Sequence, residues 1–294
     1  MTATSVTATP ARALLLEQIH PDAEEILRLS GFEVETIGRA MDEDELVDRI
    51  GEFQFVGIRS KTTITERVLD AASNLIGIGA FCIGTRQIDI AGASKRGIAV
   101  FNAPFSNTRS VVDLAIAEII VMTRRLTEKN RLMHDGVWDK SSDGAHEVRG
   151  RTLGIVGYGN IGMQLSVLAE NLGMRVLFYD TADRLALGNA RRCLSLEELL
   201  ANSDVVTLHV DDRPSNKNFF GEEEFAAMRS GSLFLNLSRG FVVDYSALRK
   251  HIEVEHIHGA AVDVFPVEPK RRGEEFASEL RGLPNVILTP HIGG

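Results

Sequence analysis

Cysteine is scarce in this chain, and that scarcity narrows the class of protein. The 294 residues include two cysteines, Cys82 and Cys193, which do not form a C-x-x-C motif. Eight histidines are present, but no zinc-like cluster is visible among them. The pattern argues against a redox dithiol or a structural zinc site, so no metal is expected, and it is typical of a protein in a reducing cytoplasm.

The chain also lacks an excess of positive charge and a long apolar run. Its net charge of −9 argues against nucleic acid or an anionic membrane as the main partner. The longest apolar-rich segment, residues 114–122, is interrupted by Glu118 and indicates a buried or interfacial helix rather than a membrane span. Residues 1–11 lack the apolar core of a secretory signal, and we expect a flexible tail there.

Short apolar strands alternate with amphipathic helices after this tail, which predicts an α/β protein with two domains of parallel β-α-β units. The first domain is expected over residues 12–106 and the second over residues 107–294. Residues 110–131 are apolar over much of their surface and predict one long helix, buried either between domains or in a dimer contact. The expected strands are 13–16, 33–37, 55–58, 75–78 and 98–101, then 153–156, 176–179, 205–210, 232–237, 259–264 and 285–289.

A glycine-rich turn between two of these strands carries the first functional signal. Gly157, Gly159 and Gly162 form a G-x-G-x-x-G pattern that opens a helix. The first glycine permits the tight turn, the second lets a pyrophosphate approach, and the third lets helix and strand pack closely. The backbone N–H groups of Asn160 and Ile161 are expected to face the phosphates at the positive end of the helix dipole.

Asp180 ends the strand that follows this helix and predicts which dinucleotide binds. A carboxylate there accepts hydrogen bonds from the adenosine ribose and repels the extra phosphate of NADP, so NAD is favoured. Arg184, Arg191 and Arg192 lie just downstream, and we interpret them as solvated surface charges unless they fold back toward the acid.

Three further strand ends bear residues that suit the oxidation of a 2-hydroxy acid. Arg239 can hold a carboxylate with its planar fork, His291 can take a proton from an alcohol, and Glu268 can orient the histidine and raise its pKa. Each has an ordinary alternative, such as pairing of Arg239 with Asp244. Asp263 is a weaker candidate for a place near the nicotinamide. His209 also ends a strand, and we interpret it as structural.

Several motifs together resemble those of the D-isomer-specific 2-hydroxyacid dehydrogenases. They are the G-Y-G-N-I-G turn, Ser238-Arg239-Gly240, Asp263-Val264-Phe265 with Glu268-Pro269, and Thr289-Pro290-His291-Ile292-Gly293-Gly294. The resemblance implies a flavodoxin-like substrate-binding domain and a doubly wound Rossmann domain that binds NAD. By position it implies a catalytic set, Arg239, Glu268 and His291. The cofactor contacts that it implies are Asn160, Ile161, Asp180, Leu237, Ser238, Asp263, Gly293 and Gly294.

Residues 81–85 and 101–110 narrow the resemblance to members that oxidise 3-phosphoglycerate. That likeness implies a phosphorylated small-molecule substrate and serine biosynthesis, and we expect a homo-oligomer. The substrate contacts that it implies are Arg59, Ser60, Lys61 and Asn107. Two cations flanking a hydroxyl also make a reasonable phosphate cradle on chemical grounds. Members of the family normally continue beyond the position of Gly294 with a segment that returns to the first domain, so we expect weak activity from this chain.

Two alternatives remain open at this point. The same chemistry could act on another 2-hydroxy acid, such as 2-hydroxyglutarate, although Arg59 and Lys61 favour a phosphate. The chain could instead be a non-catalytic NAD-binding protein, which the joint presence of Arg239, Glu268 and His291 argues against.

Overall fold

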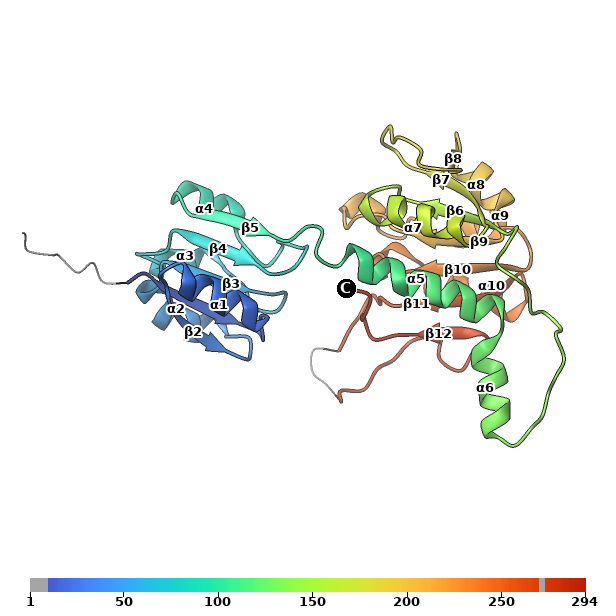
Figure 1. Ribbon diagram of the computed structural model, residues 1–294, viewed down its shortest axis with the longest axis horizontal. Helices are drawn as coiled ribbons and strands as arrows, with labels where there is room; N and C mark the ends of the chain where they lie inside the picture. Colours follow the sequence, from blue (N-terminus) through green and yellow to red (C-terminus); the bar gives the residue numbers. More distant parts are fainter. Residues whose placement is uncertain (1–9, 270–272) are drawn as a thin grey trace, which may run out of the picture. The chain divides into compact units, whose positions relative to one another are not determined.

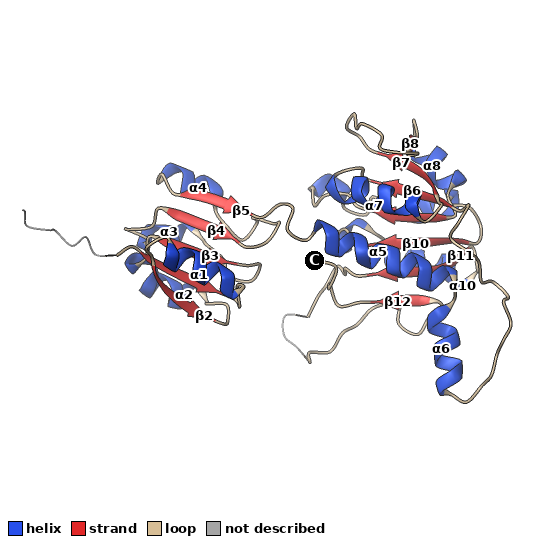
Figure 2. Cartoon of the chain, in the orientation of Figure 1, coloured by secondary structure: helices blue, strands red, loops and turns tan. Residues whose placement is uncertain are grey.

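Parallel strands joined by helices build both parts of the chain, as Figure 2 shows. The computed structural model describes residues 10–269 and 273–294. The chain divides into two compact units, Met1–Ser106 and Asn107–Gly294. The flexible tail expected over residues 1–11 falls mostly on residues 1–9, which lie outside the described residues, and the first strand begins at Arg12.

The first unit contains a five-stranded parallel sheet in the order β2-β1-β3-β4-β5 (Figure 1). This is the flavodoxin-like order, so the predicted fold is confirmed. The order reverses between β1 and β3, which places the carboxyl ends of these two strands side by side at the switch point of the sheet. The elements are β1 (Arg12–Leu16), α1 (Pro21–Leu29), β2 (Glu33–Ile37), α2 (Glu43–Arg49), η1 (Ile50–Glu52), β3 (Phe55–Ile58), α3 (Glu66–Ala71), β4 (Gly77–Ala80), α4 (Ile90–Lys95) and β5 (Ala99–Asn102).

The core of this unit follows from the alternation of side chains along buried strands. Leu14, Val56 and Ile78 pack in one cluster with residues of α2, α3 and α4, whereas Leu15 packs with α1 on the other face. Strand β4 begins two residues later than predicted. It runs on through Gly79, where a β-carbon would lie 2.7 Å from the Phe55 ring, so this glycine marks close packing inside a strand rather than its end.

The second unit contains a seven-stranded parallel sheet in the order β12-β11-β10-β9-β6-β7-β8, which confirms the predicted doubly wound Rossmann fold. Helices α5 and α7 pack on one face, and α8, α9 and α10 on the other. The elements are α5 (Thr108–Thr123), α6 (Leu126–His134), β6 (Thr152–Val156), α7 (Asn160–Asn171), β7 (Arg175–Tyr179), β8 (Arg191–Arg192), α8 (Leu196–Asn202), β9 (Val205–Leu208), η2 (Pro214–Asn216), α9 (Glu222–Ala227), β10 (Ser232–Asn236), η3 (Gly240–Val242), α10 (Tyr245–Glu253), β11 (Ile257–Val262) and β12 (Val286–Leu288).

Two predictions for this unit are wrong. The single helix expected over residues 110–131 is two helices, α5 and α6, separated at Arg125, whose φ of 52° is left-handed. The break is held because the Arg125 guanidinium bonds Glu128 and the Asp143 carbonyl, and His146 N–H donates to the Thr123 carbonyl. The short edge strand β8 is absent from the predicted strands, because its two exposed arginines carry no apolar pattern.

Candidate functional site

The glycine turn between β6 and α7 has the geometry that a pyrophosphate requires. Gly157 has a φ of +92°, and a β-carbon there would lie 2.7 Å from the His209 backbone, so no larger residue fits. A β-carbon at Gly162 would lie 2.4 Å from the Gly157 carbonyl oxygen, which is the close helix–strand approach predicted for it. A β-carbon at Gly159, in contrast, would meet nothing within 4 Å. Of the three glycines, this one leaves the backbone open to a ligand.

Helix α7 begins at Asn160 immediately after this opening. Its N-cap residue, Gly159, supplies no side-chain cap, so the first N–H groups of this 12-residue helix, among them those of Asn160 and Ile161, are oriented for an external acceptor. An anionic ligand at this end would satisfy them. These residues fit the phosphates of a dinucleotide.

Asp180 lies at the end of β7 and faces the same turn. Its Oδ2 accepts the Tyr158 N–H at 2.8 Å, and its Oδ1 accepts the Ala182 N–H at 2.7 Å. The carboxylate is thus fixed by backbone donors before any ligand binds, with lone pairs left for ribose hydroxyls. Two of the downstream arginines do fold back: Arg184 Nε lies 3.6 Å from Asp180 Oδ2, and Arg192 Nη2 donates to the Asp180 carbonyl at 3.2 Å.

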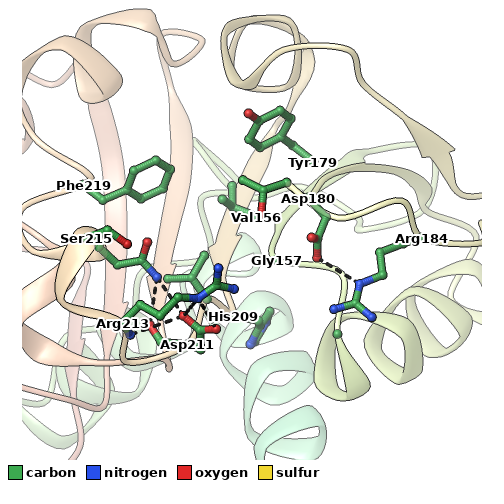
Figure 3. A pocket seen from close by; sticks show the side chains of 14 residues that line it. Val156, Gly157, Tyr179, Asp180, Arg184, His209, Asp211, Arg213, Ser215 and Phe219 are labelled. Atoms are coloured by element: carbon green, nitrogen blue, oxygen red, sulfur yellow. Dashed lines mark hydrogen bonds and ion pairs between the residues drawn. The ribbon is translucent and has the colours of Figure 1, made fainter.

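A pocket of about 340 Å³ lies beside this acid, between the ends of β6, β7 and β9 (Figure 3). Figure 3 shows Arg184 directed at Asp180, and Arg213 directed at Asp211 on the other side, where Arg213 Nε lies 2.7 Å from Asp211 Oδ2. Each arginine in the pocket is therefore neutralised by its own acid. Because no excess positive charge remains on the described residues that line it, the pocket suits an uncharged adenosine better than one bearing an additional phosphate.

His209 lines this pocket, although no motif around it in the sequence assigns it there. Its Nε2 is 3.0 Å from Thr207 Oγ1, whereas its Nδ1 is buried without a hydrogen-bond partner among the described residues. Burial lowers the pKa of His209 to about 4, so the ring is neutral at physiological pH. Its position after β9, a central strand beside β6, is the signal that could have identified it.

His291 and Glu268 form the clearest ionisable pair of the second unit. His291 Nδ1 lies 2.8 Å from Glu268 Oε2, and Glu268 Oε1 accepts the Phe265 N–H at 3.0 Å. The hydrogen bond with Glu268 is the largest cause of a raised pKa at His291. Burial acts to raise the pKa of Glu268, but the hydrogen bond with His291 and the one from Phe265 outweigh it, and the pKa is lowered.

Arg239 follows β10, and its Nη1 donates to the Ser238 carbonyl at 2.7 Å. A β-carbon at Gly240 would lie 2.0 Å from the Phe265 carbonyl carbon, so the turn after Arg239 packs directly on the segment that leads to Glu268. The positive charge of Arg239 acts to lower the pKa of both Glu268 and His291. Buried Asn236, which sequence reasoning missed, shapes the turn: its Nδ2 donates to the Arg239 carbonyl and its Oδ1 accepts from Ser238.

Asp263 is 2% exposed, and its carboxylate is occupied by the segment that carries His291. It accepts hydrogen bonds from Thr289 Oγ1 at 2.6 Å, Ile292 N–H at 2.9 Å and Gly293 N–H at 2.8 Å. In this structure its contacts are to the protein. The remaining predicted cofactor residues lie nearby: Leu237 and Ser238 are buried after β10, and Gly294 lies against Asn107 at the start of α5.

The predicted phosphate-binding residues fall into both units. Arg59, Ser60 and Lys61 follow β3 in the first unit, and all three side chains are exposed. Asn107 belongs to the second unit, where its Oδ1 is buried without a hydrogen-bond partner among the described residues.

Over residues 10–269 and 273–294, no group of three or more histidine, cysteine or acidic side chains lies close enough together to hold a metal ion. Across the same residues, every helix is too short or too polar to cross a bilayer.

Comparison with known proteins places these features in context. Residues 116–293 match the model of the D-isomer-specific 2-hydroxyacid dehydrogenase, NAD-binding domain. The chain is 48% identical over 291 residues to the D-3-phosphoglycerate dehydrogenase of Haemophilus influenzae, covering 99% of this chain and 71% of that protein. It is 50% identical over 282 residues to the enzyme of the same name from Escherichia coli K12, covering 96% and 69% respectively.

Solved structures of similar fold include one that is complexed with NAD. A protein from Thermus thermophilus superposes with a TM-score of 0.84 at 32% identity, over 96% of this chain and 89% of that one. The D-lactate dehydrogenase of Aquifex aeolicus, complexed with NAD and lactic acid, gives a TM-score of 0.80 at 27% identity, over 96% and 88%. The open glycine turn and the fixed acid thus lie in a domain of a known NAD-binding type.

Proposed function

The chain belongs to the D-isomer-specific 2-hydroxyacid dehydrogenases, which use NAD, and from that premise we propose that it oxidises 3-phosphoglycerate to 3-phosphohydroxypyruvate. This reaction would be the first step of phosphorylated serine biosynthesis. The observation that carries the proposal is the His291–Glu268 hydrogen bond beside Arg239, in a chain about half identical to named phosphoglycerate dehydrogenases.

The residues of the second unit suit the chemical step. In its neutral form His291, oriented by Glu268, takes the proton of the 2-hydroxyl group, and the imidazolium that forms is stabilised by the Glu268 carboxylate. Arg239 binds the substrate carboxylate with its planar fork. NAD, when bound, accepts the hydride from the carbon that bears the 2-hydroxyl group. The alcohol thus loses a proton to His291 and a hydride to NAD, and becomes a ketone.

The cofactor contacts follow from the nucleotide turn. The phosphates would lie over Gly159 at the start of α7, and Asp180 would accept hydrogen bonds from the ribose. Leu237, Ser238, Asp263, Gly293 and Gly294 stay predictions as contacts of the nicotinamide half. In the first unit, Arg59, Ser60 and Lys61 would bind the substrate phosphate, and Asn107 of the second unit would contribute to substrate binding.

We also propose that the protein forms a homo-oligomer and acts in the cytoplasm. Trp138, which is 78% exposed, and Met133 present apolar surface on and after α6, which supports a contact with a second copy. Cys82 and Cys193 are both free thiols, which suits a reducing compartment. Light scattering of the purified protein measures the mass, and a monomer at every concentration would contradict the oligomer.

NADH formation distinguishes the candidate functions. The protein is assayed with NAD and 3-phosphoglycerate, 2-hydroxyglutarate or D-lactate, and again as Arg239→Ala. We expect the highest kcat/KM with 3-phosphoglycerate and a large loss in Arg239→Ala. Arg149→Ala, in which an exposed arginine paired with Glu147 is removed, is the matched control. A preference for 2-hydroxyglutarate would overturn the substrate, and tight NADH binding without turnover of any acid would indicate a non-catalytic protein.

A further inference from the structure

A buried carboxylate, that of Glu17, holds the loop that carries the exposed cations Arg59 and Lys61. Glu17 follows β1, and the segment Arg59–Thr62 follows β3, its neighbour in the sheet. Glu17 is 8% exposed. Its Oε1 accepts the N–H of Arg59 at 3.2 Å and of Thr62 at 2.7 Å, and its Oε2 accepts the N–H of Lys61 at 2.9 Å. A single side chain thus takes three backbone donors of one short loop.

The backbone of Glu17 is itself held in an unusual conformation. Its φ is +64° and that of Gln18 is +53°, a left-handed region that residues with a β-carbon rarely occupy. The Glu17 N–H is fixed by the carbonyls of Ile37 and Arg39, at 3.1 and 3.2 Å. Strained non-glycine residues of this kind persist where the surrounding contacts determine them, and they concentrate at functional sites.

Gln87 holds the same loop from its other side. Its Nε2 donates to the Arg59 carbonyl at 2.8 Å and also to the Gly84 carbonyl at 3.1 Å. Glu17 therefore accepts three of the four backbone N–H groups of Arg59–Thr62, all but that of Ser60, and Gln87 donates to the Arg59 carbonyl. The side chains of Arg59, Ser60 and Lys61 remain exposed.

This arrangement decides how the loop can bind an anion. In many phosphate sites the backbone N–H groups contact the phosphate directly. Here the N–H groups of Arg59, Lys61 and Thr62 donate to a carboxylate instead, so recognition depends mainly on the exposed side chains, with the Ser60 N–H as the one donor of the loop that Glu17 does not accept. The loop also lies at the switch point of a flavodoxin-like sheet, where ligands of open α/β sheets bind.

We propose that Glu17 is a positioning residue for the phosphate of the substrate: it fixes the backbone of Arg59–Thr62 so that the two cations and the hydroxyl are presented together. The proposal rests on the function proposed above, since it assigns the loop to the substrate phosphate. Glu17 itself touches no substrate, and its effect passes through the loop that it holds.

Glu17→Gln tests the proposal because it keeps the size of the side chain while replacing one acceptor oxygen by an NH₂ donor. Losing a charge-assisted acceptor should raise KM for 3-phosphoglycerate by about tenfold. We expect kcat and the KM for NAD to stay within about twofold, and Glu17→Asp to give an intermediate KM. Glu25→Gln, at an exposed position on α1, is the matched control. A fall in kcat with KM unchanged would overturn the proposal.

Amide hydrogen exchange provides a readout that needs no substrate. In Glu17→Gln the amides of Arg59, Lys61 and Thr62 should exchange faster, while those of the central strand β1 stay protected. Unchanged exchange at the three amides would overturn the proposal, and so would faster exchange with an unchanged KM. Faster exchange throughout β1 would show general loss of stability and contradict a local role.

An inorganic phosphate titration separates this proposal from the proposed function. If the wild-type protein does not turn over 3-phosphoglycerate, the amide resonances of residues 59–62 are followed as phosphate is added. Weaker binding by Glu17→Gln than by the wild type supports the role of Glu17 even when the substrate is another phosphorylated acid. Equal binding by the two proteins, or no binding by either, would overturn it.

Discussion

Glu268 and His291 are joined by a hydrogen bond of 2.8 Å between Oε2 and Nδ1, across 23 residues of chain. The two loops that carry them follow neighbouring strands, β11 and β12. The pairing engages Nδ1, so the other ring nitrogen, Nε2, is the one proposed to exchange a proton. It also raises the pKa of His291, which makes the pH dependence of the reaction a direct report on the pair.

Glu268→Gln should therefore move the acidic limb of the pH profile for oxidation. His291 must be neutral to accept a proton, so activity rises as the pH increases through its raised pKa. Removing the carboxylate lowers that pKa and shifts the limb to lower pH, while the less well oriented ring reduces kcat by about 10- to 100-fold. Profiles of kcat/KM for the wild type and for Glu275→Gln, at an exposed acid, give the comparison. An unmoved limb would mean that Glu268 does not set the pKa of His291.

Asp263→Asn should loosen the segment that bears His291. An amide has one acceptor oxygen in place of the two that receive Thr289, Ile292 and Gly293, so at least one donor loses its partner. We expect a loss of about 1–3 kcal/mol in the free energy of unfolding, measured in urea, together with a lower kcat. Asp135→Asn, an exposed acid after α6, should change neither. A variant of Asp263 with wild-type stability would argue that these bonds do not hold the segment.

Asp180→Ala should weaken NAD binding and reduce the preference for NAD over NADP. The loss of an acceptor for the ribose should raise KM for NAD by about tenfold, with a much smaller effect on kcat. Asp183→Ala is a close control, because Asp183 lies three residues away on the surface and pairs with Arg192. Equal effects of the two substitutions would indicate that charge in the region, rather than the fixed position of Asp180, controls the affinity.

Glu118→Gln should stabilise the protein at neutral and alkaline pH. Glu118 is 4% exposed, and burial, with the nearby charge of Asp263, raises its pKa to about 8. An acid whose pKa is higher in the folded state holds its proton more strongly there, so stability declines as the pH rises from the unfolded pKa to about 8. The glutamine cannot ionise. Its advantage over the wild type should grow by about 1.4 kcal/mol per pH unit between roughly pH 5 and pH 8.

Urea unfolding at about pH 5, 7 and 9 measures this difference, with Glu223→Gln, at an exposed acid on α9, as a control. A difference between Glu118→Gln and the wild type that does not change with pH would show that Glu118 ionises normally in the folded protein.

The placement of residues at the carboxyl ends of the strands of the second unit could be predicted from the sequence, because it follows from the positions of the strands along the chain. Strand ends in a parallel sheet share one edge, so Arg239, Glu268 and His291 could be assigned to the same place from strand positions alone. The nucleotide turn was equally accessible, since glycine spacing and Asp180 fall within one β-α-β unit. What could not be predicted is that Arg184 lies close to Asp180 while Arg213 pairs with Asp211.

The contacts that position the loops of both units could not be predicted from the sequence. Glu17 bonds Thr62 across 45 residues, and that pairing depends on the register of β1 and β3, which no local pattern reveals. Asn236 lies within an apolar strand run, where nothing indicates that it shapes the Arg239 turn. The break at Arg125 was missed because helical periodicity continues through it, and only contacts with the returning loop determine the left-handed residue.

The most direct test of the account is NADH formation from 3-phosphoglycerate by the wild-type protein and by His291→Asn, with NADH binding measured by fluorescence in both. We predict turnover by the wild type, a loss of about 100-fold or more in kcat for the variant, and equal affinity for NADH. His258→Asn, at an exposed histidine of β11, should behave as the wild type. An unchanged kcat in His291→Asn would contradict the assignment of His291 as the base.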